Sequence, residues 1–545
     1  MENNFFVEGQ LVDVYREDIY PAKIRIQNGR IKEISRLTSS APHYILPGLI
    51  DAHVHIESSM LTPGNFAAMA VSKGTVAVLS DPHEIANVLG IKGIDFMIDD
   101  SRKVPFNFFF GAPSCVPATV FEESGSKIGA DEIEYLMERN DIYFLSEMMN
   151  FPGVLMGDHE IEKKISIAKR FGKRIDGHAP ELTGNELKKY AGSGITTDHE
   201  CASMKEAEEK IRNGMKILIR EGSAARNFDE LMPLIDLETH NVMLCTDDIH
   251  PDDLEKGHID RLIRKGMNNG LSIFNLLRAS SLNPKRHYNL DIGMLQINDH
   301  ADFIVAKDLD SLQVITTFIR GIPVYDDGKV LFNYTCETRP NRFVKNFIKP
   351  DDLQVHADGN KINVIVARDG DLRTGREWIT PVISNGFVTT DANRDILKIV
   401  VLNRYRKARP NVGFIHGFGL KKGAFASSIA HDSHNIIGVG ANDDDLCAAI
   451  NIISEHKGGI SVVDDNKTDI LPLPVGGILS DKEGNTVAGK YKKLTGQVKQ
   501  LGSRLLAPFM TLSFMALLVI PDLKIGDRYL FDVKRFKPIG LFERM

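Results

Sequence analysis

An apolar run that ends in two histidines constrains this chain more than any other stretch. It reads Pro-Gly-Leu-Ile-Asp-Ala-His-Val-His over residues 47–55, so that His53 and His55 lie two positions apart. Residues two apart in a strand point to the same face, and both imidazoles would therefore lie on one side of a strand end. Such a pair is typical of a divalent metal site. For this motif alone, a buried strand with two hydrogen-bonded histidines is the alternative.

Seven further runs follow the same plan, in which a short strand-like segment ends in polar or small residues and an amphipathic segment comes next. This alternation indicates βα units and a parallel sheet, hence an α/β fold. Eight is the strand number of a (β/α)8 TIM-type barrel, in which the carboxyl strand ends surround one mouth and bring distant residues together. The eight runs cover residues 46–55, 75–84, 106–117, 142–150, 174–180, 195–200, 215–223 and 242–250.

The segments on either side of the barrel, which would span residues 47–290, predict two further domains. Residues 1–46 and 291–340 both show short alternating segments, and we expect them to form one small discontinuous β-sandwich domain. Residues 341–545 contain helix-like and strand-like segments and are long enough for a core of their own. We expect this region to form a C-terminal α+β domain that covers the barrel mouth.

Composition excludes several classes of protein. The net charge is −7 and there is no Lys/Arg block, which disfavours a nucleic-acid partner and fits a small substrate. The five cysteines are odd in number and lack a CxxC pair, which argues against a disulfide framework and for a reducing compartment. The sequence starts without a secretory pattern and has no apolar run long enough to span a bilayer. We therefore expect a cytoplasmic protein with no membrane partner.

The strand ends collect side chains that bind metals. The expected ligands of two divalent ions are His53, His55, Glu147, His178, His199 and Asp247. Imidazoles and carboxylates suit zinc, manganese or iron, and a catalytic centre must leave a position for water. Asp247 would complete the first site beside the histidine pair, and Glu147 would bridge to the second. A hydroxide held between two metals is a strong nucleophile at neutral pH, so the pattern predicts a dinuclear hydrolase.

Six motifs stand out, of which the IESSM extension of the histidine pair, the DPHE run and the run from residue 426 are more specific than that pair. The six are PGLIDAHVHIESSM from residue 47, DPHEIANV from residue 81, DGHAP from residue 176, TDHE from residue 197, CTDD from residue 245 and ASSIAHDSHN from residue 426. Through these motifs the sequence resembles the amidohydrolase superfamily and, within it, closely resembles the bacterial adenine deaminases. The likeness extends over nearly the whole chain.

The resemblance implies hydrolysis of adenine by water to hypoxanthine and ammonia, as in purine salvage or catabolism. It implies a dinuclear site of Mn²⁺ or Fe²⁺, with Zn²⁺ as a further candidate, in which Glu147 replaces the carboxylated lysine of many relatives. The bridging hydroxide would attack the purine, with Asp247 as the proton shuttle and Glu147 as a second catalytic residue. We also expect a homo-oligomer, most simply a dimer.

Further polar residues at the strand ends are expected to contact the substrate. These candidates are Asp248, His83, Glu84, Arg220 and Glu221. His83 and Glu84 have two alternatives, an accessory metal and plain loop hydrogen bonds, and Arg220 with Glu221 would equally form an ion pair on the barrel rim. In the C-terminal region, His431 and His434 are candidate lid residues, with an ordinary polar loop as the alternative.

Two other functions stay open on the sequence. One is a cyclic-amide hydrolase of the same superfamily, such as a dihydropyrimidinase or dihydroorotase, although those relatives usually bridge their metals with a modified lysine. The other is a metal-stabilised scaffold without activity. The second is disfavoured because convergent acid, base and ligand residues serve no packing need.

Overall fold

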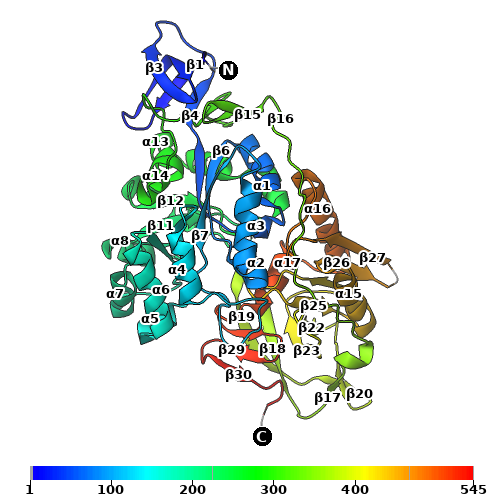
Figure 1. Cartoon of the computed structure of the whole chain (residues 1–545). Helices are drawn as coiled ribbons and strands as arrows, with labels where there is room; N and C mark the ends of the chain where they lie inside the picture. The colour runs from blue at the N-terminus through cyan, green and yellow to red at the C-terminus, as the bar shows by residue number, and fades with distance from the viewer. Residues whose placement is uncertain (1–3, 224, 466, 544–545) are drawn as a thin grey trace.

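All eight strand-like runs form strands in the computed structural model, which describes residues 4–223, 225–465 and 467–543. They form a five-stranded and a three-stranded parallel sheet, which together curl into the TIM-type barrel that the sequence predicted (Figure 1). The strands are β5 (Leu49–Val54), β6 (Thr75–Ser80), β7 (Asn107–Ala112), β8 (Ile142–Met148), β9 (Arg174–Gly177), β10 (Thr197–Asp198), β11 (Lys216–Arg220) and β12 (Val242–Cys245).

The amphipathic segments between these strands form helices that cover the barrel. The helix α6, for example, starts after Asp158, whose carboxylate accepts the free N–H groups of Glu160 and Ile161. Its apolar side is buried and most of its charged residues face outward, as the helical spacing requires, whereas Lys164 is buried and donates to the Ser114 and Ile128 carbonyls. The longer helices are α1 (Pro63–Ala70), α3 (Ile91–Ser101), α4 (Ala130–Glu138), α6 (His159–Arg170), α7 (Gly184–Gly192), α8 (Met204–Arg212) and α12 (Ile259–Asn268).

The barrel has a seam between its last strand and its first, where the regular ladder stops. The backbone of Asp247 closes this seam, because its N–H donates to the His53 carbonyl at 2.9 Å and its carbonyl accepts from the His55 N–H at 3.0 Å. Asp247 adopts a left-handed conformation with φ of 58°. Aspartate and asparagine tolerate this region better than other side chains do, which makes an aspartate suitable at the seam.

A buried carboxylate braces the same seam from within. Asp51 on β5 accepts from the Thr246 N–H at 3.0 Å and lies 2.8 Å from Nε2 of His258. Nδ1 of His258 in turn contacts the Thr75 hydroxyl at 2.7 Å. Asp51 therefore connects the first, second and last strands through groups that are all buried.

We expect Asp51→Ala to destabilise the protein by about 3–5 kcal/mol, because it leaves a buried histidine and a threonine without their partner. A fall in the melting temperature, followed by circular dichroism, would measure this. Asp18→Ala serves as the control, since it breaks an exposed ion pair with Arg36 that is worth at most about 1 kcal/mol. Equal melting temperatures for the two variants would contradict the bracing role.

A second sheet carries strands from both sides of the barrel. Its order is β16-β15-β14-β13-β4-β1-β2-β3, and it packs at one end of the barrel (Figure 1). The N-terminal strands are β1 (Asn4–Asp13), β2 (Asp18–Gln27), β3 (Arg30–Arg36) and β4 (Tyr44–Pro47), and the later ones are β13 (Phe303–Ala306), β14 (Val314–Ile319), β15 (Ile322–Asp326) and β16 (Lys329–Val330). Residues 1–46 and 291–340 thus contribute to one structure, as a single eight-stranded sheet.

The C-terminal region has an eight-stranded sheet of its own. The order is β19-β18-β23-β22-β25-β24-β26-β27, with α15 (Asp443–His456) packed on it. Its strands are β18 (Ile362–Arg368), β19 (Asp371–Ile379), β22 (Leu397–Leu402), β23 (Asn411–His416), β24 (Ala424–Ser427), β25 (Ile436–Gly440), β26 (Gly459–Asp464) and β27 (Lys467–Pro472).

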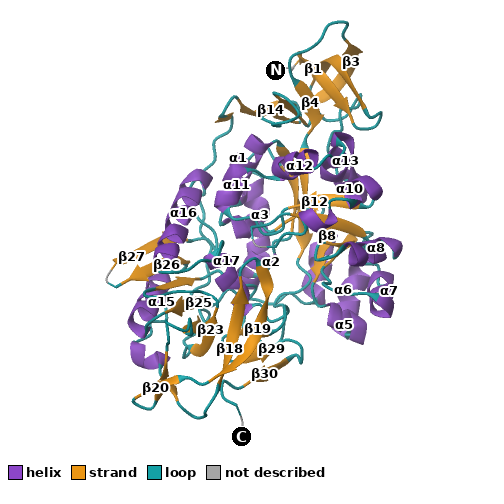
Figure 2. Cartoon of the chain, turned by 180° about the vertical axis from the view of Figure 1, so that it is seen from behind, coloured by secondary structure: helices purple, strands orange, loops and turns teal. Residues whose placement is uncertain are grey.

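The C-terminal region also contacts the barrel directly. The helix α16 (Gly484–Gln500) packs against α11 (Pro251–Lys256), which follows the last barrel strand (Figure 2). The short helix α17 (Pro508–Ser513) lies between the C-terminal sheet and the barrel (Figures 1 and 2). Among the helices that the structure describes, none has the length and apolar character needed to cross a bilayer.

Candidate active site

Glu147 lies at the centre of a buried cluster of histidines at the carboxyl ends of the barrel strands. Its Oε2 is 2.8 Å from Nδ1 of His178 and 3.1 Å from Nε2 of His199. Its Oε1 is 3.4 Å from Nε2 of His55. One carboxylate thus faces histidines from three other strand ends, which is the arrangement expected of a bridging ligand.

Asp247 makes the second meeting point. Its Oδ1 is 3.1 Å from Nε2 of His55 and 3.5 Å from Nε2 of His53. The rings of His53 and His199 stack with centroids 4.3 Å apart, which connects the two parts of the cluster. The six residues that we expected as metal ligands therefore converge at one place.

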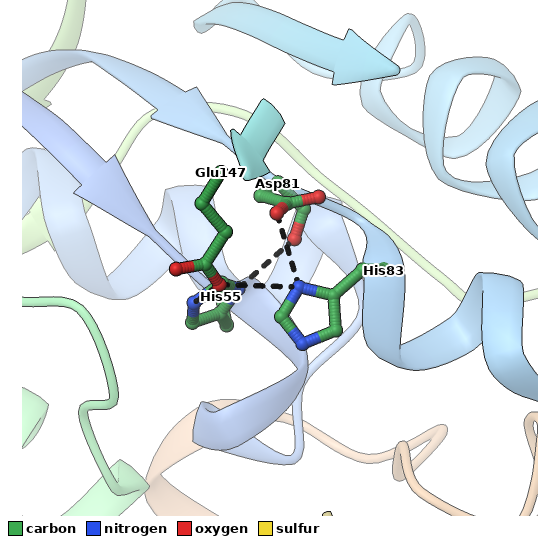
Figure 3. A group of neighbouring side chains, drawn as sticks. All are labelled: His55, Asp81, His83 and Glu147. Atoms are coloured by element: carbon green, nitrogen blue, oxygen red, sulfur yellow. Dashed lines mark hydrogen bonds and ion pairs between the residues drawn. The ribbon is translucent and has the colours of Figure 1, made fainter. Parts of the chain in front are cut away.

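Two residues beyond the six expected ligands face this cluster, namely His83, which we expected to contact substrate or an accessory metal, and Asp81. Nδ1 of His83 is 3.0 Å from Oδ2 of Asp81 and 3.5 Å from Oε1 of Glu147 (Figure 3). The carbonyl of Asp81 lies 3.1 Å from Nδ1 of His55 and accepts a hydrogen bond from it. Nε2 of His55 then has no proton and faces the carboxylates, where it can bind a metal. We did not predict Asp81 as a ligand, although it begins the Asp-Pro-His-Glu motif that follows the second strand.

The charges in the cluster keep both central carboxylates ionised. Burial alone would raise the pKa of Glu147, but His178 and His199 outweigh it and hold that pKa well below its usual range. His199 and Arg220 do the same for the pKa of Asp247 against the effect of burial. Two ionised carboxylates among imidazoles form a hard-to-borderline donor set of the kind that divalent transition metals prefer.

His53 tests whether this cluster fits a metal. It is buried, and its Nε2 has no hydrogen-bond partner among the described residues. Burial, together with the neighbouring His199, lowers the pKa of His53 and keeps the ring neutral. An unpaired, neutral nitrogen facing Asp247 is costly unless it binds something there, and a divalent ion fits both the nitrogen and the carboxylate.

A cavity adjoins the cluster, with walls from two parts of the chain. The barrel provides the histidines and carboxylates together with Asp248, Glu200 and Arg220. The C-terminal region provides an apolar roof and two polar residues, which are Leu372, Phe514, Leu517, Ile520, His431 and Asp432. Residues of the barrel and of the C-terminal region therefore line the same cavity.

Arg220 and Asp248 lie on the cavity wall with defined partners. A guanidinium nitrogen of Arg220 donates to Oδ2 of Asp247 at 2.7 Å, and the same group pairs with Glu200, a cavity residue that our sequence analysis did not propose. Oδ1 of Asp248 accepts from the hydroxyl of Ser58. Both candidates are therefore placed where a bound molecule would meet them.

Glu221 is placed elsewhere. Its carboxylate accepts from Nζ of Lys265 at 3.1 Å, and the described residues that line the cavity do not include it. Glu221 therefore has no place in the substrate contacts that we propose below. By contrast, Glu84 lines the cavity and its carboxylate contacts both His431 and His434, which connects the second βα loop to the C-terminal region.

Comparison with known proteins agrees with this geometry. Residues 44–330 match the amidohydrolase family, and residues 371–537 match the adenine deaminase C-terminal domain. An adenine deaminase from Methanosarcina barkeri is 53% identical over 98% of this chain and 99% of its own length. An adenine deaminase from Salinibacter ruber is 48% identical over 99% of this chain and its entire length.

Proposed function

From the premise that this chain belongs to the amidohydrolase family and, within it, to the adenine deaminases, we propose that the cavity binds adenine and that its residues convert adenine and water to hypoxanthine and ammonia. The observation that carries this proposal is one buried site with two ionised carboxylates, clustered histidines and a roof from the adenine deaminase C-terminal domain.

Two divalent ions would be held by the cluster. The proposed ligands are His53, His55, Asp247, Glu147, His178 and His199, with Asp81 and His83 as further donors beside them. We propose Mn²⁺ or Fe²⁺, with Zn²⁺ as a further candidate, since all three accept imidazole and carboxylate ligands. When bound, such ions lower the pKa of water enough to supply hydroxide near neutral pH.

Asp247 and Glu147 are the proposed catalytic residues. As the water oxygen attacks C6 of the purine, the C6–N1 double bond opens, N1 takes up one of the two water protons, and an Asp247 oxygen accepts the other. The same oxygen returns this proton to the exocyclic nitrogen, so that the C6–N bond breaks and ammonia leaves. Arg220 holds the other oxygen of Asp247 at 2.7 Å and thereby fixes the orientation of the carboxylate.

Asp248 would orient the purine. Its carboxylate is anchored by Ser58 and accepts a hydrogen bond from an N–H of the substrate. Leu372, Phe514 and Leu517 of the C-terminal region would pack on the flat ring and exclude bulk water. His83, Glu84 and Arg220 complete the polar wall.

We expect two transition-metal ions per chain in fully active protein. Elemental analysis by inductively coupled plasma mass spectrometry measures this number directly, and a chelator should remove activity that Mn²⁺ or Fe²⁺ restores. Full activity with one ion per chain would contradict the dinuclear site. A related readout is thermal stability, because ligands that bind only the folded chain raise its melting temperature.

The decisive assay uses a panel of nucleobases and cyclic amides, with ammonia release and the ultraviolet change followed together. We expect ammonia from adenine and no ring opening of dihydropyrimidines or hydantoins. The reverse result would favour the cyclic-amide hydrolase.

We further propose that the protein forms a homodimer. We also propose that it works in the reducing interior of the cell, since the five cysteines are buried and free of disulfides in the described chain.

A further inference from the structure

His431 is a polar residue of the C-terminal region to which the proposed function gives no role. It lies in the loop after β24, far from the barrel in sequence, yet it lines the same cavity as the metal-binding cluster. The ring is fixed on two sides. Its Nδ1 contacts Oε1 of Glu84, and its face stacks on Phe514 with centroids 4.3 Å apart and planes 22° apart.

The contact with Glu84 determines which edge of the ring is available. With Nδ1 directed to the carboxylate, Nε2 lies on the opposite edge, and His431 borders the cavity. Burial alone would lower the pKa of His431, but Glu84 outweighs it and raises that pKa to about 9. At neutral pH the ring would therefore carry protons on both nitrogens and donate from both.

We propose that His431 is a substrate-contacting residue, which donates from Nε2 to an acceptor nitrogen of the purine ring, and that Glu84 is its positioning residue. The proposal rests on the proposed function, because it names a contact of the purine in that site. Asp248 lies on the same cavity and offers an acceptor. A donor and an acceptor together fit a free nucleobase, which has both a bare ring nitrogen and a ring N–H.

His434 provides a matched comparison. It contacts the other oxygen of the Glu84 carboxylate, but among the described residues it does not line the cavity. Its Nδ1 accepts from the Ala430 N–H at 3.3 Å, so that Nε2 carries the proton that faces Glu84. His434 therefore holds Glu84 in place without reaching the substrate.

The test measures binding without turnover. Dissociation constants of hypoxanthine, 3-deazahypoxanthine and 7-deazahypoxanthine are measured by calorimetry on the metal-loaded protein. Wild type should bind one of the two deaza analogues about tenfold to a hundredfold more weakly than hypoxanthine, the usual effect of losing one charged hydrogen bond. We call this ratio of the two dissociation constants the gap. In His431→Phe, which keeps the stacking on Phe514, the gap should shrink to within about twofold. His434→Gln should keep the gap.

Further controls make the outcome decisive. The melting temperature of each variant shows whether it folds, and His431→Leu, which also lacks a donor, replaces the phenylalanine variant if that one does not. Glu84→Ala should lose the gap, and Glu84→Gln, which keeps an acceptor oxygen, should restore part of it. A gap that persists in His431→Phe, or that is absent from wild type with both analogues, overturns the proposal. Failure of wild type to release ammonia from adenine would instead refute the proposed function.

Discussion

Replacing Asp247 with asparagine is expected to reduce kcat for adenine by at least about two orders of magnitude, the usual effect of losing general acid or base catalysis. Asparagine cannot accept and return the water proton. It does tolerate the left-handed conformation that residue 247 adopts, so the backbone bonds to His53 and His55 should survive. The variant thus removes the proton shuttle while it keeps the barrel closed. Steady-state kinetics of the metal-loaded variant measure the effect.

Asp248→Asn is the matched control for this experiment, because it makes the same chemical change at the next residue. Asp248 is held by Ser58 and is proposed to contact the purine only. We expect its replacement mainly to raise KM and to relax the choice among purines, with a much smaller change in kcat. If the two variants had the same kcat defect, the separation of their roles would be wrong.

Replacing Glu147 with glutamine is expected to abolish most of the activity, again by at least about two orders of magnitude, and to lower the metal content below two ions per chain. The change removes the negative charge that faces His178, His199 and His55 while it keeps the size of the side chain. Elemental analysis and kinetics on the same preparation would separate loss of metal from loss of chemistry.

The control for Glu147→Gln is Glu181→Gln, at a largely exposed residue that pairs with Arg373. It should change neither metal content nor kcat, since an exposed ion pair contributes little. Circular dichroism should show that both variants keep the fold. Two tightly bound ions and near-normal turnover in Glu147→Gln would refute the bridging role.

The sequence predicted the barrel and the convergence of these histidines and carboxylates because both follow from local patterns. Each ligand ends a strand-like run, and parallel strands bring their carboxyl ends to one mouth whatever lies between them. No local sequence pattern predicts the contact of Glu84 with His431. Its two residues are separated by 347 positions, and the contact depends on how the C-terminal region packs on the barrel.

Neighbouring residues at the strand ends explain where the prediction of substrate contacts was too broad. Arg220 and Glu221 follow strand alternation, so Arg220 faces the cavity while Glu221 turns outward to Lys265. Asp247 and Asp248 are also adjacent, yet both line the cavity. The left-handed conformation of Asp247 breaks the alternation there, and no periodicity in the sequence announces that conformation.

The seam of the barrel imposes an evolutionary constraint on residue 247. Its backbone must hold a conformation that few side chains accept, and its side chain must carry an ionised oxygen toward His53 and His55. Asparagine satisfies the first demand and glutamate the second, but aspartate satisfies both. Substitution of residue 247 is therefore restricted by both its backbone conformation and its side-chain charge. Selection that keeps the aspartate for turnover also preserves the closure of the barrel.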